Sequence, residues 1–125
     1  MSSIDSVNWT ELAEVYRLGP LGPYDPEQLK RAYEKSNVCC FAYRGTQLVA
    51  AGRALSDGED FAFVCDIVVS PEFQRQGVGT CIMNTVLERL NADKVFLTCV
   101  IGQEGLYKKL GFLKHKSVMA LYPNA

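Results

Sequence analysis

The sequence lacks the features of several protein classes. It has a single histidine, His115, and its five cysteines include no C-x-x-C pair, so neither a zinc site nor Cys/His catalysis is predicted. An odd number of cysteines also argues against a disulfide framework. No apolar run approaches the ~20 residues of a membrane-spanning helix, and the net charge of −1 gives no reason to expect nucleic-acid binding. We therefore expect no metal, no nucleic acid and no membrane among the partners of this chain.

The beginning of the chain also lacks the signs of a signal peptide. Met1-Ser2-Ser3-Ile4-Asp5 has neither a basic start nor an apolar core, so we expect a cytoplasmic protein. The length of 125 residues, of which 48% are hydrophobic, fits one domain that spans residues 1–125 and buries a core of its own.

Two helices are predicted before the first strand. Asn8 is a candidate N-cap, and Glu11 follows three residues later, as in a capping box. Gly19 is expected to end this helix. Asp25 followed by Pro26 is a second start signal, because proline suits the first helical position.

The rest of the sequence predicts strands, with two more helices between them. An antiparallel hairpin and a turn lead into a β-branched, aromatic run that suits a buried strand. This order predicts an α+β domain with a mixed sheet. Strands are expected at residues 38–43, 47–55, 61–69, 94–98 and 113–121, and helices at 78–90 and from 104 onward.

The most informative stretch is the glycine turn Gln74-Arg75-Gln76-Gly77-Val78-Gly79, between the buried strand and an amphipathic helix. Glycine lets the backbone approach a ligand closely, and the unpaired N–H groups of a helix start hold anions such as a pyrophosphate. A P-loop would need a Lys-Ser/Thr pair after the second glycine. A dinucleotide-binding turn would need a third small residue where Ile82 stands. Neither of these two motifs therefore fits.

Two segments carry a resemblance to a known family. The pattern Q-x-x-G-x-G after a strand ending in Ile67-Val68-Val69 resembles the acetyl-CoA loop of the GNAT superfamily of N-acetyltransferases. Glu104-Gly105-Leu106-Tyr107-Lys108-Lys109-Leu110-Gly111-Phe112 is similar to its FY-x-x-LGF segment, with Leu106 where Phe is common. The resemblance covers about residues 38–120. It implies the GNAT fold, a central mixed, mostly antiparallel sheet flanked by about four helices. In that fold the sheet opens between the strand that carries Ile67-Val68-Val69 and the next strand, and the pantetheine arm lies in the gap.

The resemblance implies an acetyl-CoA-dependent N-acetyltransferase that uses no metal. Such an enzyme moves the acetyl group to a primary amine of a small molecule by direct attack in a ternary complex, and arylalkylamines are a candidate acceptor class. Three alternatives stay open: a catalytically weak CoA-binding sensor or interaction module, a protein or peptide N-acetyltransferase, and a small interaction protein whose glycine turn binds no nucleotide.

The resemblance also implies which residues hold the cofactor. The backbone of the buried strand is expected to pair with the pantetheine, and the glycine turn to wrap the pyrophosphate. Arg75 would add a charge there, although it could equally be a solvated turn residue. The predicted cofactor-binding residues are Ile67, Val68, Val69, Gln74, Arg75, Gln76, Gly77, Val78, Gly79, Thr80 and Tyr107.

Tyr107 is the first candidate for a catalytic side chain. In the family this tyrosine lies near the CoA sulfur and can give it a proton. An unperturbed phenol titrates near ~10 and is protonated at neutral pH, so it can act as an acid. The alternative is that Tyr107 only packs against the cofactor.

Asp66 is the second catalytic candidate and, with Tyr24, a candidate for binding the substrate. It is the only ionisable residue of the buried strand, where alternation predicts a common face with Ala62, Val64 and Val68. It could take the amine proton through a water or bind a cationic substrate. The alternative is a buried structural aspartate, and Glu104 is a further candidate base.

A homodimer is a candidate assembly. In this superfamily dimers often form through C-terminal strands, and Val118-Met119-Ala120-Leu121 could be such an edge. An ordinary core strand would explain the same apolar residues.

Overall fold

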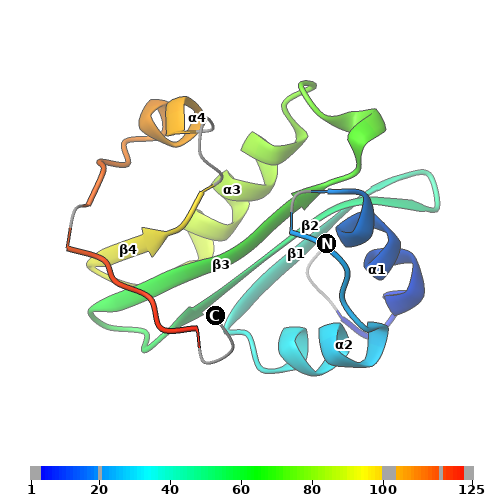
Figure 1. The fold of residues 1–125 in the computed structure, drawn as a ribbon, viewed down its shortest axis with the longest axis horizontal. Helices are drawn as coiled ribbons and strands as arrows, with labels where there is room; N and C mark the ends of the chain where they lie inside the picture. Colours follow the sequence, from blue (N-terminus) through cyan, green and yellow to red (C-terminus); the bar gives the residue numbers. More distant parts are fainter. Residues whose placement is uncertain (1–3, 20, 100–103, 116, 123–125) are drawn as a thin grey trace.

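The computed structural model describes residues 4–19, 21–99, 104–115 and 117–122. Its centre is a four-stranded sheet in the order β1-β2-β3-β4, with helices around it (Figure 1). The predicted α+β class with a mixed sheet is confirmed. The elements are α1 (Trp9–Leu18), α2 (Pro26–Glu34), β1 (Val38–Arg44), β2 (Gln47–Ser56), β3 (Phe61–Val69), the 3-10 turn η1 (Pro71–Phe73), α3 (Val78–Arg89), β4 (Lys94–Leu97) and α4 (Glu104–Lys109).

Strand pairing leaves part of one strand edge open. β1 with β2 and β2 with β3 are antiparallel, whereas β3 and β4 are parallel. The last residue of β4, Leu97, pairs with Val64, so β4 covers only the first part of β3. The rest of β3, from Cys65 to Val69, has no strand beside it on that side in the described part of the chain.

Side-chain caps fix the two N-terminal helices where the sequence predicts them. Asn8 Oδ1 accepts the backbone N–H of Glu11 at 3.0 Å, which satisfies one free donor of α1. The Glu11 carboxylate does not close the second half of a capping box. It accepts the N–H of Leu48 at 2.9 Å and so ties α1 to β2. Asp25 caps α2, with Pro26 at its first position.

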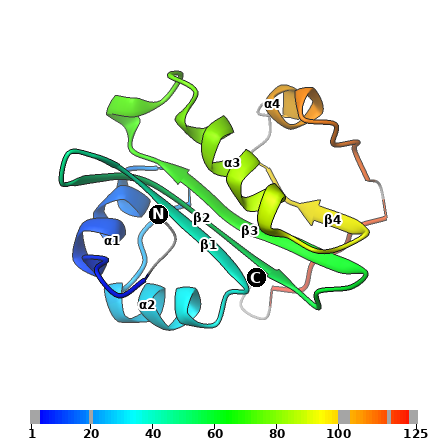
Figure 2. The same cartoon turned by 180° about the vertical axis from the view of Figure 1, so that it is seen from behind.

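The helices form two layers. α1 and α2 cover one face of the sheet, and α3 covers the other (Figure 1 and Figure 2). Two buried clusters fill the interfaces. The first joins α1 and α2 to the sheet around Leu12, Tyr16 and Tyr33. The second joins α3 to the sheet around Met83 and Val86.

A β-bulge in β3 decides which way its side chains point. Arg53 pairs with Asp66, but the next residue of β2, Ala54, pairs with Val64, so Cys65 is an extra residue in β3. An extra residue reverses the alternation of faces. Val64 accordingly packs with α3, whereas Val68 packs with α1 and α2. The prediction that Asp66 shares a face with Val64 is therefore wrong.

The predicted last strand does not form. Residues 113–115 and 117–122 contain no strand. The backbone N–H and the hydroxyl of Ser117 bond to His115 Nδ1 at 3.3 and 2.8 Å, and such local bonds compete with strand pairing. Apolar side chains of this segment stay exposed, among them Met119 at 94% and Leu121 at 89%. Within the described ranges, no helix has the length and apolar character to cross a membrane.

Candidate active site

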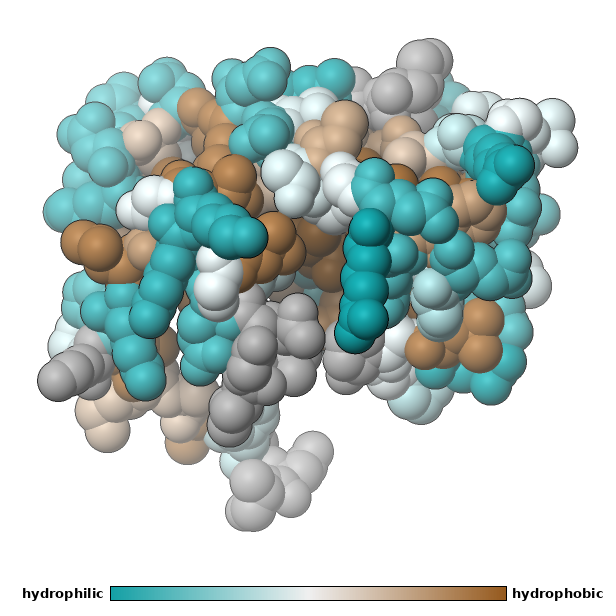
Figure 3. All heavy atoms as spheres, turned by 90° about the horizontal axis from the view of Figure 1, so that it is seen from above, coloured by the Kyte–Doolittle hydropathy of each residue, from teal (hydrophilic) through white to brown (hydrophobic). Residues whose placement is uncertain are grey.

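A cavity of about 510 Å³ lies along the part of β3 that β4 leaves open. Figure 3 views the molecule from the end where the glycine turn and α4 lie, and apolar surface shows there between hydrophilic side chains. The cavity walls come from the α1–α2 loop, β3, the glycine turn, the start of α3, the chain after β4, and α4. They are Leu21, Val64, Cys65, Asp66, Ile67, Val68, Val69, Gln74, Arg75, Gly77, Gly79, Thr80, Leu97, Thr98, Cys99, Leu106 and Tyr107.

The glycine turn directs the start of α3 towards this cavity. Arg75 and Gly77 have φ of 65° and 83°, in the left-handed region, and Gly77 is the N-cap of α3. Cys81 N–H donates to Gly77 O at 3.0 Å as the first bond of the helix. The N–H groups of the three residues between them therefore have no carbonyl of their own helix to bond. Unpaired donors and the positive end of the helix dipole together favour a bound anion.

The two glutamine side chains of the glycine turn donate hydrogen bonds to backbone carbonyls close to the turn. Gln74 Nε2 donates to Val69 O at 3.2 Å, and Gln76 Nε2 donates to Glu72 O at 3.2 Å. Gln74 lines the cavity, but Gln76 and Val78 do not, and Val78 packs against the α3 cluster. Any contact of Gln76 or Val78 with a ligand in this cavity would thus come from the backbone.

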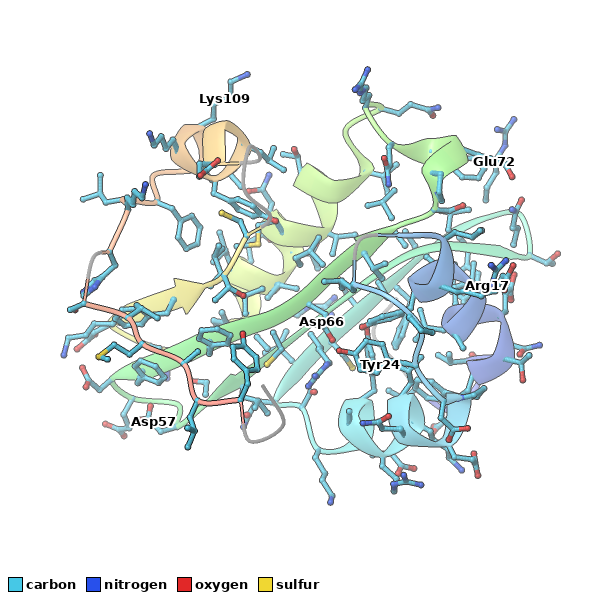
Figure 4. The ribbon with its side chains drawn as sticks, in the orientation of Figure 1. Arg17, Tyr24, Asp57, Asp66, Glu72 and Lys109 are labelled. Carbon is cyan, nitrogen blue, oxygen red and sulfur yellow. The ribbon has the colours of Figure 1, made fainter. Side chains whose placement is uncertain are left out.

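Asp66 sits in a buried polar network at the other end of the cavity. Its Oδ2 accepts hydrogen bonds from Arg53 Nε at 2.8 Å and from the Tyr16 hydroxyl at 2.9 Å. The Tyr16 and Tyr33 hydroxyls lie 2.8 Å apart, so the network joins β2, β3, α1 and α2. Figure 4 shows Asp66 beside Tyr24, whose ring packs edge-on against Tyr16 with centroids 5.3 Å apart.

Burial and charge set the protonation of this network. Burial raises the pKa of Tyr16 far above its usual value, and Tyr33 and Asp66 add to the effect. Burial also raises the pKa of Tyr33. For Arg53, burial opposes the charge, but the Asp66 carboxylate more than offsets it, and the pKa of the guanidinium is raised. Both phenols are therefore neutral donors, and Arg53 is a fixed cation.

Tyr107 lies on α4 and lines the cavity. Burial raises the pKa of its phenol, and the sulfur of Cys99 acts in the same direction. The Tyr107 ring packs edge-on against Phe112 with centroids 6.2 Å apart, which fixes its orientation. Tyr107 is thus a half-buried, protonated phenol that borders the same cavity as the glycine turn.

Several lining residues have no signal in the sequence. Leu21 lines the cavity, whereas Tyr24, predicted to bind the substrate, is not among its lining residues. Thr98 and Cys99 follow β4 and reach the cavity because β4 is short. Glu104 lines a second cavity of about 680 Å³ instead, between β4, α4 and the C-terminal segment. Proximity in a mixed sheet depends on register, which local sequence does not encode.

No group of three or more His, Cys, Asp or Glu side chains that could hold a metal ion occurs within the residues that the structure describes. The cavity offers backbone N–H donors at the start of α3, the carboxylate of Asp66, the phenol of Tyr107 and the thiols of Cys65 and Cys99.

This combination, a mixed sheet opened beside a strand that turns through glycines into a helix, defines an acyl-CoA-binding class of fold. The model of the acetyltransferase (GNAT) family matches residues 6–112. The chain belongs to this family.

Known relatives agree with that assignment. The chain is 32% identical over 72 residues to an uncharacterized N-acetyltransferase, ycf52, of Porphyra purpurea, covering 55% of this chain and 41% of that protein. It is 34% identical over 68 residues to GCN5-related N-acetyltransferase 1, chloroplastic, of Arabidopsis thaliana, covering 52% and 34%. The matches thus span less than half of either relative. A GNAT family acetyltransferase of Streptococcus pneumoniae superposes with a TM-score of 0.80 at 25% identity, covering 98% of this chain and 99% of that one.

Proposed function

We propose that this protein transfers the acetyl group of acetyl-CoA to a primary amine of a small molecule. One observation carries the proposal. A single cavity joins the free N–H groups at the start of α3, the open edge of β3 and the phenol of Tyr107. Binding of acetyl-CoA and protonation of its leaving thiolate would need an anion site, an extended channel and a proton donor.

The described residues fit acetyl-CoA. The backbone at Gly77, Gly79 and Thr80 offers donors for a pyrophosphate, and Arg75 adds a cation at the rim. Beyond Val64 no described strand lies beside β3 on this side, so its edge at residues 67–69 offers backbone groups to an amide-containing arm, with Val69 O already accepting from Gln74 Nε2. When bound, acetyl-CoA supplies an activated acyl group. The protein holds it and directs it towards Tyr107 and Asp66.

Tyr107 is the proposed general acid. Because burial raises the pKa of its phenol, it keeps its proton throughout the neutral range. As the neutral amine forms its N–C bond and the C–S bond breaks, the phenol gives this proton to the leaving thiolate, and the proton that the amine nitrogen loses returns to the phenolate. Cys99, which influences that pKa, lines the same cavity.

The part of the cavity at Asp66 favours an amine that bears an apolar group. Leu21, Val64 and Cys65 line it, with Asp66 as its carboxylate. A carboxylate that accepts a hydrogen bond beside an apolar wall suits an arylalkylamine, with the Tyr24 ring nearby on Tyr16. The same fold carries many acceptors, so an exposed peptide amine is the alternative substrate.

Two measurements test the proposal. Isothermal calorimetry with acetyl-CoA is expected to show micromolar binding. A thiol-release assay over a panel of aryl-, alkyl- and peptide amines, with mass spectrometry of the products, is expected to show turnover with an arylalkylamine. Binding without release on any amine would indicate a CoA sensor instead. If acetyl-CoA does not bind, the glycine turn has a packing role only.

Assembly and location belong to the same proposal. Exposed apolar side chains at Leu113, Met119 and Leu121 suit an interface in a homodimer. Sedimentation analysis is expected to give a dimer that Met119→Lys dissociates, and an unchanged sedimentation coefficient for this variant would contradict the interface.

The cytoplasmic location stays a prediction, and fluorescence microscopy of the tagged protein in its own cells tests it.

A further inference from the structure

Arg53 and Tyr16 converge on one oxygen of Asp66. Both donate to Oδ2, at 2.8 and 2.9 Å, and within the described residues the other oxygen, Oδ1, has no hydrogen bond. The side chain of Asp66 is 11% exposed and that of Arg53 is 20% exposed, so the pair is largely shielded from water. Asp66 nevertheless lines the cavity. One carboxylate oxygen is thus fully engaged, and the other is left for a ligand.

The surroundings explain why a charged pair persists here. Arg53 comes from β2, Tyr16 from α1 and Tyr33 from α2, and the Arg53 guanidinium also lies 5.8 Å from the centroid of the Tyr33 ring. Cys65 flanks Asp66 on β3. Tyr107 and Cys99 also line the cavity. Arg53 is the only fixed cation among these groups, and two donors to one oxygen stabilise the ionised carboxylate.

We propose that Arg53 and Tyr16 are positioning residues that hold the Asp66 carboxylate by Oδ2, with Oδ1 turned to the acceptor amine. Asp66 then accepts a hydrogen bond from the amine nitrogen and orients it. The proposal rests on the proposed acetyl transfer. It adds two residues, from β2 and α1, that no local motif marks.

The geometry of the bulge supports this arrangement. In a regular strand Val64 and Asp66, two positions apart, would share a face. With the bulge, Val64 packs with α3 while Asp66 reaches Tyr16 on α1. The bulge places Asp66 opposite Arg53 and beneath Tyr16. One backbone irregularity therefore brings Asp66 within hydrogen-bond distance of both Arg53 and Tyr16.

The test compares Arg53→Gln, which removes the cation, with Arg53→Lys, which keeps it, and Tyr16→Phe, which removes one donor. For each variant, kcat/KM for an amine that the wild type acetylates is measured from pH 5.5 to 8.5. The ratio of variant to wild type cancels the titration of the amine itself. Thermal unfolding checks that each variant is folded.

A second readout needs no substrate. The protein is labelled with ¹³C at the aspartate carboxyl carbons, and Asp66→Asn assigns the Asp66 signal. The pH at which this signal titrates is then followed in the wild type and in the three variants.

For Arg53→Gln, we expect kcat/KM relative to the wild type to be lowest at pH 5.5 and to rise towards pH 8.5. The Asp66 signal should titrate at a higher pH than in the wild type, because the adjacent opposite charge is lost. Arg53→Lys should restore most of the wild-type pH dependence of kcat/KM and most of the wild-type Asp66 signal. Tyr16→Phe should give values between those of the wild type and Arg53→Gln. If Arg53→Gln does not fold, the other two variants carry the same test.

A flat ratio together with an unmoved Asp66 signal would overturn the positioning role. Loss of activity at all pH values alike would assign Arg53 a structural role only, and would overturn it too. A wild type that binds no acetyl-CoA and releases no thiol would instead overturn the proposed function, whatever the carboxyl signal does.

Discussion

Gly79 allows the anion site at the start of α3 to be tested without disturbing the fold. It is the second residue of α3, and a Cβ there would lie 3.5 Å from Val69 Cγ2, an ordinary contact. Gly77 is unsuitable, because its φ of 83° strains any residue with a side chain. We therefore choose Gly79→Asp, with Gly79→Asn as a control of the same size and shape but no charge.

The two effects of the aspartate have opposite signs. A carboxylate in the first turn of a helix stabilises the fold by about 0.3 to 1 kcal/mol through the helix dipole. The same carboxylate repels a bound pyrophosphate. At about 4 Å, two unit charges interact by about 1 kcal/mol in water and about 4 kcal/mol at an effective dielectric constant of 20. Since about 1.4 kcal/mol is tenfold in affinity, binding should weaken roughly fivefold to several hundredfold.

Calorimetry with acetyl-CoA and thermal unfolding without it measure the two effects separately. We expect Gly79→Asp to keep or raise the midpoint of unfolding while it loses affinity, and Gly79→Asn to bind like the wild type. Added salt should narrow the difference, because exposed charges are screened. Equal affinities of the Asp and Asn variants would refute the placement of a phosphate at this helix end.

Two further predictions concern the packing around Gly52 in the core and the proposed general acid, Tyr107. Gly52→Ala should cost about 1 to 3 kcal/mol, or roughly 3 to 15 °C in thermal midpoint, because the new Cβ would lie 2.6 Å from Ile82 Cγ2 and 2.9 Å from Ile67 Cδ1. Gly105→Ala, with nothing within 4 Å, is the matched control, and equal midpoints for the two variants would contradict the close packing of α3. Tyr107→Phe should lower kcat roughly 10- to 1,000-fold while the Kd for acetyl-CoA stays within about threefold, since it removes a proton donor and keeps the ring. An unchanged kcat would mean that Tyr107 has a packing role and is not the general acid.

Local signals were enough to predict most of the fold. Asn8 and Asp25 cap helices where the sequence predicts them, because capping depends on residues within one turn. The buried strand 61–69 and the helix after the glycine turn also form as predicted, since apolar periodicity is local. The turn itself combines left-handed positions with unpaired N–H groups, and its residue types already indicate both.

What the sequence could not show depends on pairing across the sheet. The bulge at Cys65 arises only when β3 is matched to β2, and no residue type marks it. Arg53 lies 13 positions before Asp66, and Tyr16 lies 50 positions before it, so their meeting follows from topology. The apolar segment at 117–122 fails for a related reason. Its pattern suits a strand, but a strand also needs a partner edge, and periodicity does not supply one.

The register of β3 against its two neighbours therefore determines where the chemistry lies. On one side, the bulge turns Asp66 to the network of Arg53 and Tyr16. On the other side, β4 ends opposite Val64 and leaves the adjacent edge open. Because both irregularities fall at neighbouring residues of β3, an anchored carboxylate and an unpaired backbone edge meet at one end of the cavity. A change that removed the bulge would put Val64 and Asp66 on one face of β3, so either the packing of Val64 with α3 or the contact of Asp66 with Tyr16 would be lost.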